Sequence, residues 1–157
     1  MAKALLGHER FSHPTADPNV MNRAIEALKQ TAKDTPNGGG TMWDDTLLRR
    51  RVAALEMDAL CLQSTRYRYL TKVEHGESPG PETLIFKLFG AELMQRIVEL
   101  QQEVAGPAGI TWGSEPFGLE TGEIAIHATN IRAATIRGGT AEVYRNVIAQ
   151  RVLHLPR

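Results

Sequence analysis

The sequence contains a single cysteine, no excess of charge of either sign and no long apolar run. One cysteine, Cys61, excludes an internal disulfide and is typical of a reducing compartment. The 18 basic and 18 acidic side chains cancel, so the chain lacks the electrostatic footprint of a nucleic-acid binder. No apolar run approaches the roughly 18–20 residues of a membrane span, and the first residues do not resemble a signal peptide. We therefore expect a soluble, cytoplasmic protein with no nucleic-acid partner and no membrane span.

Metal ligands and activated nucleophiles are also poorly represented. His8 and Glu9 begin like a zinc-protease motif, but the next histidine, His13, lies five residues on rather than four, so the two imidazoles cannot share a helical face. No Gly-x-Ser-x-Gly motif occurs. Cys61 lies in an apolar helical pattern, where cysteine is usually inert packing. We expect no metal site and no hydrolase triad.

Helical periodicity dominates the rest of the chain. A short helix is expected over residues 2–11. Three longer apolar stripes at spacings of three and four predict amphipathic helices. The first stripe consists of Met21, Ile25, Leu28 and Ala32. The second consists of Leu48, Val52, Leu55, Ala59, Leu62, Arg66, Tyr69 and Val73. The third consists of Phe86, Phe89, Leu93, Ile97, Leu100 and Val104. Residues 123–135 alternate like a strand but also fit a helix, and their helical neighbours favour helix. The pattern predicts an all-α, antiparallel helical bundle.

The connecting segments are rich in glycine and proline. Residues 34–41, with three consecutive glycines, predict a flexible loop, and residues 78–81 predict a turn in which Pro81 opens the next helix. Asp17 or Asn19 can cap the helix that follows Pro18. Gly76 is suited to end the longest helix.

The last thirty residues contain a loop that opens a helix. Gly138 and Gly139 supply backbone freedom, and Thr140 is a good N-cap. Glu142 places a carboxylate where the helix dipole favours it. An apolar stripe follows, and Pro156 is expected to stop the helix; the stripe consists of Val143, Val147 and Ile148. Such a turn is typical of a plain cap, and its free N–H groups also make it a candidate anion seat.

The same stretch resembles the terminal signature of flavin-dependent acyl-CoA dehydrogenases, T-I-x-G-G-T-S-E-I-Q-R-N-I-I-A-E-R-V-L-G-L-P-R. Here the matching stretch runs from Thr135 to Pro156, and it begins with Thr-Ile-Arg-Gly-Gly-Thr-Ala-Glu-Val-Tyr-Arg-Asn. Leu5-Leu-Gly-His-Glu-Arg resembles the L-x-x-E-R opening of the family's C-terminal domain, and residues 80–87 resemble a later helix start. Gly106-Pro-Ala-Gly109 stands where many members carry G-G-x-G. The resemblance covers essentially the whole chain.

The resemblance implies a C-terminal helical domain over residues 1–157, without the family's N-terminal helical and middle β-domains. It implies FAD as cofactor, an acyl-CoA thioester such as a fatty-acyl-CoA as substrate and an electron-transfer protein as acceptor. In such enzymes a carboxylate removes the α-proton while the β-hydride passes to the flavin. We expect the isolated chain to be inactive and free of FAD.

The position of the base follows from two residues. Many members carry a glutamate immediately before the G-T of the terminal motif, but Gly138 at that position has no side chain to take a proton. A minority carry the base in the E-R of the opening motif, where Glu9 stands. The resemblance therefore implies Glu9 as base, with Arg10 as the cation that keeps it ionised.

Flavin contacts are implied at two places. Gly139, Thr140 and Glu142 match positions beside the adenine side of the flavin, and Gly106 and Gly109 match a turn that approaches the flavin of a neighbouring subunit.

The chain departs from the family pattern at two other positions. Glu103 replaces a glutamine that commonly contacts that neighbouring flavin, and the frequent Arg-x-Phe-Gly motif is missing from residues 38–43. The resemblance implies a homodimer or tetramer that pairs through the bundle. Two alternatives remain open: a non-catalytic subunit of a mixed dehydrogenase complex, and a stand-alone interaction module that pairs through the Leu48 to Val73 seam.

Overall fold

A computed structural model describes residues 17–77, 80–112 and 119–156, with only the backbone for residues 119–122. The described helices are α2 (Pro18–Asp34), α3 (Thr46–Glu74), α4 (Leu84–Ala105), α5 (Leu119–Asn130) and α6 (Ala141–Arg151). Short 3-10 turns connect them: η2 (Met42–Asp44), η3 (Pro81–Thr83), η4 (Gly106–Ile110) and η5 (Ile131–Thr135). The predicted all-α class is confirmed. The helix expected over residues 2–11 lies outside the described residues.

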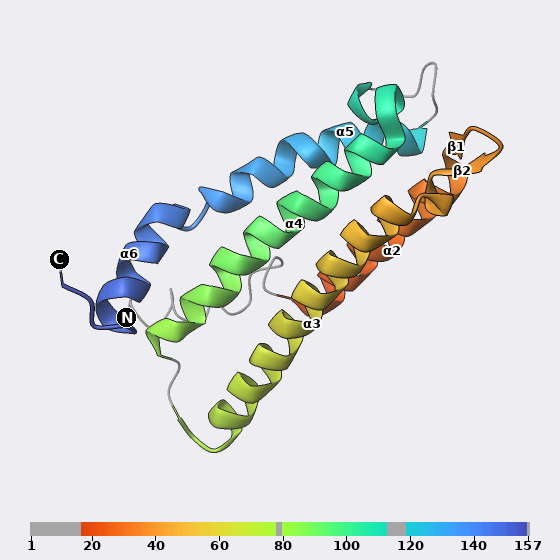
Figure 1. The fold of residues 1–157 in the computed structure, drawn as a ribbon. Coiled ribbons are helices and arrows are strands. Elements are labelled where there is room, and N and C mark those ends of the chain that lie inside the picture. Colours follow the sequence, from red (N-terminus) through yellow and green to blue (C-terminus); the bar gives the residue numbers. More distant parts are fainter. Residues whose placement is uncertain (1–16, 78–79, 113–118, 157) are drawn as a thin grey trace.

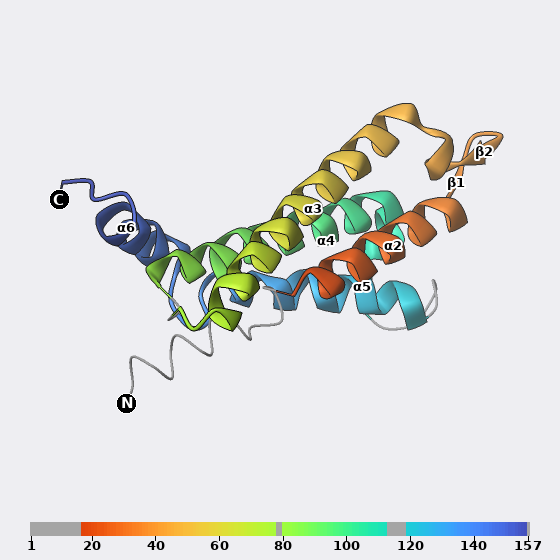
Figure 2. The ribbon, with the colours of Figure 1, turned by 90° about the horizontal axis from the view of Figure 1, so that it is seen from below.

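Helix α4 is the centre of the arrangement. Figure 1 shows it between the α2–α3 pair on one side and the run of α5, η5 and α6 on the other. It packs against α2, α3, α5 and α6, and most extensively against α2. The view from below in Figure 2 places α3 along the outer edge of the bundle. Because α4 has helices on two sides, it must bury more of its surface than its neighbours do.

The first two described helices form for the reasons that their sequences indicate. The Asp17 carboxylate accepts the Asn19 N–H at 3.0 Å and caps α2, and the predicted stripe of α2 is buried. Asp45 caps α3 by accepting the Leu47 N–H at 2.7 Å. Gly76, at φ 83°, ends α3 with hydrogen bonds from two successive N–H groups back to Val73 and Lys72.

The α3 seam is buried at Leu48, Val52, Leu55, Ala59, Leu62 and Tyr69, and Arg66 is half-buried. The prediction was wrong for Val73, which is 40% exposed. With 29 residues, α3 is longer than α2 with 17 or α4 with 22, so its last turn lies beyond most of its packing partners. The seam packs inside the bundle, and it is therefore not available for pairing with another molecule.

The predicted α4 stripe and the helical interpretation of residues 123–135 are both confirmed. The stripe is buried apart from Phe89, which is half-buried. Residues 123–135 form the end of α5 and η5, with Ala128 buried. Pro81 opens η3, which leads directly into α4.

The segment predicted as a flexible loop is instead a small hairpin. Strands β1 (Pro36–Asn37) and β2 (Gly40–Thr41) pair antiparallel, with Gly38 at φ 60° in the turn. The Asp44 carboxylate accepts the N–H and the hydroxyl of Thr41 at 2.8 and 3.1 Å. These bonds tie the hairpin to η2, which leads into α3, and the glycine content alone does not reveal them. None of the described helices carries an apolar stretch long enough to cross a membrane.

Candidate functional site

The terminal turn lies where η5 gives way to α6. Gly138 and Gly139 adopt φ values of 72° and 123°, a region that favours glycine. The Thr140 hydroxyl accepts the Val143 N–H at 3.4 Å, so the predicted N-cap is confirmed. The turn is thus built by its own residues, and it presents the first turn of α6 at one end of the bundle (Figure 1).

Two predictions about α6 itself were wrong. Val143 is 52% exposed, and the buried face consists of Ala141 and Tyr144 because, among the described elements, this short helix packs mainly against α4 and η3. Pro156 does not end the helix. Helix α6 ends at Arg151, and His154 follows at φ 53°, so the chain has already left the helix before the proline.

A buried lysine holds the terminal turn against α4. Lys87 is only 2% exposed, and its Nζ donates to the Gly139 carbonyl at 2.9 Å. The same ammonium lies 4.7 Å from the centre of the Tyr144 ring. The Tyr144 hydroxyl in turn donates to the Gly138 carbonyl at 2.5 Å. Burial lowers the pKa of Lys87, because the charged form loses hydration that these contacts only partly replace.

Sequence reasoning missed Lys87, although a signal for it exists. Helix α4 carries a second buried stripe at steps of three and four, made of Leu84, Lys87, Ala91, Met94 and Val98. Lys87 is the charged member of this otherwise apolar stripe. A lysine in such a place must find a polar partner within the fold. The stripe was overlooked because a helix with two partners has two apolar faces.

The first turn of α6 is partly occupied by its own side chains, which limits the anion seat considered from the sequence. The Val143 N–H is taken by Thr140. The Glu142 carboxylate accepts its own backbone N–H and the Thr140 hydroxyl, which lowers the pKa of Glu142. An ionised carboxylate therefore stands where an anion would bind. The Glu142 carboxylate is better suited to accept a hydrogen bond from a donor, such as a ribose hydroxyl or an adenine amino group, than to lie beside a phosphate.

Gly139→Ala is expected to lower the free energy of unfolding by about 2–3 kcal/mol. A Cβ at Gly139 would lie 3.2 Å from the Tyr144 ring and hydroxyl, in a backbone conformation that alanine rarely adopts. Gly138→Ala is the matched control, since its Cβ would meet only the Tyr144 hydroxyl at 3.8 Å; it should cost roughly 1 kcal/mol. Chemical denaturation of both variants measures the difference. Equal losses would show that Tyr144 does not constrain the turn.

The second glycine turn lies at the other end of α4 and has internal reasons for its glycines. Gly106 adopts φ 59° as the helix ends. Gly109 is buried, and a Cβ there would lie 2.6 Å from the Gln102 carbonyl. The Gln102 side chain also donates to the Gly109 carbonyl at 3.1 Å. Both glycines are therefore required by the turn itself, whatever else it contacts.

Glu103 is a paired acid. Its two carboxylate oxygens each accept a hydrogen bond of 2.6 Å from the Arg51 guanidinium on α3. This bidentate pair lowers the pKa of Glu103 and keeps the carboxylate ionised. The guanidinium is a charge that the sequence did not place beside Glu103, and it compensates the acid at this departure from the family pattern.

The structure does not bring the two groups of predicted cofactor residues together. Lys87, under the terminal turn, and Gly106 are 19 positions apart on one continuous helix and its end, which corresponds to about 28 Å. A single flavin site within one chain therefore cannot include both turns in direct contact with the isoalloxazine ring. Glu9 and Arg10 lie outside the described residues.

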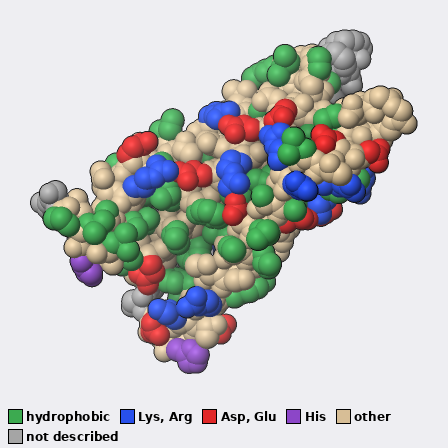
Figure 3. All heavy atoms as spheres, in the orientation of Figure 1, with side chains coloured by type: hydrophobic (Ala, Val, Ile, Leu, Met, Phe, Trp, Pro, Cys, Tyr) green, Lys and Arg blue, Asp and Glu red, His purple; other side chains and the backbone are tan. Residues whose placement is uncertain are grey.

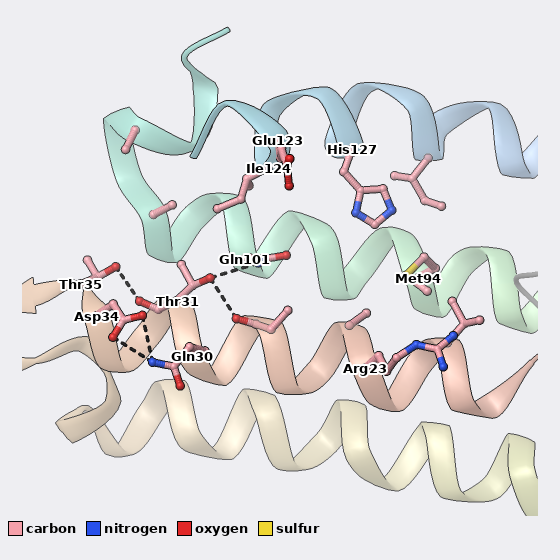
Figure 4. A pocket seen from close by; sticks show the side chains of 16 residues that line it. Arg23, Gln30, Thr31, Asp34, Thr35, Met94, Gln101, Glu123, Ile124 and His127 are labelled. Carbon is pink, nitrogen blue, oxygen red and sulfur yellow. Dashed lines mark hydrogen bonds between the residues drawn. The ribbon is translucent and has the colours of Figure 1, made fainter. Parts of the chain in front are cut away.

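A groove of about 900 Å³ runs between α2, α4 and α5 (Figure 4). It contains none of the predicted site residues. Four of its polar side chains pair with one another: Gln101 donates to the Thr31 hydroxyl at 3.0 Å, and Gln30 donates to the Asp34 carboxylate at 2.9 Å. His127 points into the groove from α5, but the described residues place no further metal-ligating pair around it.

Two further candidates from the sequence were a metal site and Cys61. Across the described ranges no group of three potential metal ligands comes together. Cys61 is exposed on α3, and so does not pack as cysteine usually does in an apolar helical pattern; its position on the helix is opposite the buried seam.

These features define the class of domain: it is an antiparallel helical bundle whose last described helix begins at a Gly-Gly-Thr turn. The model for the acyl-CoA dehydrogenase C-terminal domain matches residues 1–153. The chain therefore belongs to the acyl-CoA dehydrogenase family, and its fold is that of the family's all-α C-terminal domain.

Individual relatives agree with this assignment. Acyl-CoA dehydrogenase IpdE1 of Mycobacterium tuberculosis is 31% identical over 160 residues, covering 100% of this chain and 38% of that protein. The ChsE4–ChsE5 complex from the same organism contains a chain that is 27% identical, with a TM-score of 0.73 over 90% of this chain and 36% of that one. The Tcur3481–Tcur3483 steroid ACAD has a chain that is 25% identical, with a TM-score of 0.78 over 97% of this chain and 38% of that one. The chain thus spans little more than a third of the length of these relatives.

Proposed function

We propose that this chain acts as the C-terminal domain of an FAD-dependent acyl-CoA dehydrogenase, which oxidises the Cα–Cβ bond of an acyl-CoA thioester. The observation that carries the proposal is the family match over residues 1–153, which includes the terminal turn that Lys87 and Tyr144 hold in place. The family is one of dehydrogenases, and the turn is the most specific part of the resemblance.

In the proposed reaction Glu9 removes the α-proton of the thioester. Gly138 stands at the other family position for a base, and it offers only a backbone carbonyl, which already accepts the Tyr144 hydroxyl. Arg10, the next residue along the chain, would favour the ionised form of Glu9. When bound, FAD would supply the hydride acceptor for Cβ. The electrons would leave to an electron-transfer acceptor.

The residues at the α6 end fit part of a dinucleotide. Thr140 and the ionised Glu142 would accept hydrogen bonds from a ribose or adenine group, and Gly139 would allow close approach. The separation of about 28 Å along α4 supports a different role for Gly106 and Gly109, which would approach the flavin of another subunit. Because this chain supplies only the edges of the flavin site, we expect the isolated chain to retain no FAD and to be inactive.

We also propose that the chain associates with another subunit of the same kind. Two of the similar solved structures are named as two-chain assemblies, ChsE4–ChsE5 and Tcur3481–Tcur3483. The internal packing of the α3 seam excludes that surface as the contact. The proposed pairing therefore uses a surface other than this seam.

The test compares the chain alone with a chimera in which it replaces the matching C-terminal part of IpdE1. We expect the chimera to retain FAD and to lose the visible flavin absorbance when an acyl-CoA is added without oxygen. Straight-chain and steroid-derived acyl-CoAs should both be tried, because one relative is named as a steroid enzyme. The chain alone should show neither effect. A chimera that holds FAD but is bleached by neither class of thioester would contradict the proposal.

A further inference from the structure

Lys87 is a buried cation that has no part in the reaction proposed above. It is 2% exposed, and its Nζ has two partners, the Gly139 carbonyl at 2.9 Å and the face of the Tyr144 ring. Neither partner is an anion, and no carboxylate among the described residues forms an ion pair with it. On the face of the molecule that Figure 3 shows, by contrast, basic side chains lie beside acidic ones, as in the Arg145–Glu92 pair.

Packing alone does not require a lysine at this position. Burial in the second stripe of α4 opposes the charged form and lowers the pKa of Lys87, because the ammonium loses its hydration. A methionine would fill the space of the four-carbon stem without that cost. Replacing buried ionic groups by apolar side chains of similar volume is often neutral or stabilising. The ammonium must therefore do something that an apolar side chain cannot do, and its hydrogen bond indicates what this is.

The hydrogen bond from Lys87 fixes one peptide unit of the terminal turn. Gly139, at φ 123°, has no Cβ to restrict its backbone, so the peptide that follows it can rotate unless a group outside the turn holds it. In a planar trans peptide the carbonyl oxygen and the following N–H point in opposite directions. Because Lys87 holds the Gly139 carbonyl toward α4, the Thr140 N–H points away from α4.

The Thr140 N–H is a donor that the turn itself does not use. None of the described residues accepts a hydrogen bond from it, whereas the hydroxyl of the same residue caps α6. The Glu142 carboxylate, which accepts hydrogen bonds, lies in the same first turn of α6. The turn thus combines a donor with an acceptor, and the direction of the donor depends on Lys87.

We propose that Lys87 is a positioning residue of the flavin site: by holding the Gly139 carbonyl, it keeps the Thr140 N–H directed outward as a hydrogen-bond donor to an acceptor atom of bound FAD. This role rests on the FAD-dependent function proposed above. Lys87 itself does not touch the cofactor, because its ammonium is buried on the inner side of the turn. An apolar residue at position 87 would leave the fold in place and allow the donor to move.

Nitrogen-15 relaxation measures how firmly the Thr140 N–H is held, on the chain without any flavin. The backbone order parameter of Thr140 should be about 0.85 in the wild type, as for rigid backbone, and below about 0.6 in Lys87→Met. Met94→Ala is the matched control, because Met94 is equally buried in the same stripe, about 10 Å further along α4. It should lower stability but leave Thr140 at the wild-type value. An unchanged order parameter in Lys87→Met would overturn the proposal, whether or not FAD binds.

Chemical restoration of the ammonium separates its hydrogen bond from the packing of the stem. In a Cys61→Ser background, Lys87→Cys can be alkylated in denaturant and refolded. Alkylation with 2-bromoethylamine restores a side chain of lysine length that ends in an ammonium, and alkylation with 1-iodopropane gives the same shape without the charge. The ammonium form should restore the order parameter of Thr140, and the propyl form should behave like Lys87→Met. Equal values for the two forms would contradict a role for the hydrogen bond.

The effect on the cofactor is measured in the chimera with IpdE1. Lys87→Met should raise the dissociation constant of FAD about 3- to 10-fold, the usual effect of one lost hydrogen bond. Met94→Ala should bind FAD like the wild-type chimera. A Thr140 N–H that loosens in Lys87→Met while the affinity for FAD stays the same would show that Lys87 serves the fold alone, and the positioning role would be wrong.

Failure of this role and failure of the proposed function give different results. The affinity for FAD does not depend on turnover. A chimera that holds FAD but is not bleached by acyl-CoA therefore contradicts the dehydrogenase function, while the comparison between Lys87→Met and the wild type still decides the role of Lys87. A chimera that holds no FAD would overturn both.

Discussion

Lys87→Ala should lower the free energy of unfolding by about 2–5 kcal/mol, the range found when a long, fully buried side chain is cut back to alanine. The four-carbon stem of Lys87 is buried in the second stripe of α4, and its Nζ bonds to the Gly139 carbonyl. The variant opens a cavity beneath the terminal turn and leaves that carbonyl without its donor. Chemical denaturation followed by circular dichroism measures the loss.

Lys72→Ala provides the control for this change. Lys72 lies in the last turn of α3 and is exposed, so its removal should alter the unfolding free energy by no more than about 0.5 kcal/mol. Similar losses in the two variants would show that the burial of Lys87 contributes nothing to stability.

Lys87→Met separates the stem from the charge. Methionine fills nearly the same space but cannot donate a hydrogen bond, so amide exchange should increase at residues 138–144 while the α2–α3 core stays protected.

The dependence of stability on pH has a definite sign. Burial lowers the pKa of Lys87 below 10.5, so the folded state releases this proton before the unfolded state does. The stability of the wild type relative to Lys87→Met should therefore rise with pH from that lowered pKa up to 10.5.

The inner stripes of α2, α3 and α4 could be predicted because each consists of apolar residues at helical spacing. Burial of Met21, Val52 and Ile97 requires only that the helices pack, and period 3.6 specifies which face does so. The caps at Asp17 and Thr140 could be predicted for a similar reason, since they depend on residues two or three positions away.

The features that the sequence did not reveal depend on contacts between segments that are distant along the chain. Arg51 and Glu103 are 52 positions apart, as are Lys87 and Gly139, and no local pattern joins them. The same holds for α6, where the choice between Val143 and Tyr144 as the buried residue depends on how one short helix lies against α4.

Glu9→Gln should lower kcat of the chimera with IpdE1 by about 10²–10⁴-fold, the usual contribution of a general base. Glutamine keeps the size and most hydrogen bonds of glutamate, but its amide cannot accept the α-proton. The resemblance implies this role for Glu9, and Gly138 strengthens the case, since the alternative position carries no side chain and its carbonyl is already bonded to Tyr144. No other carboxylate in the terminal motif stands at a family position for the base.

Stopped-flow reduction of the flavin by acyl-CoA measures the chemical step, and the visible spectrum measures FAD content. Glu9→Gln should keep its FAD, because the change removes a base and not a cofactor contact. Glu142→Gln is the matched carboxylate control: it should retain kcat within a few-fold and weaken FAD binding, since Glu142 would accept hydrogen bonds from the dinucleotide. If Glu9→Gln reduces its flavin at the wild-type rate, the base lies elsewhere. If instead both variants lose FAD together, Glu9 acts on the cofactor site rather than on the α-proton.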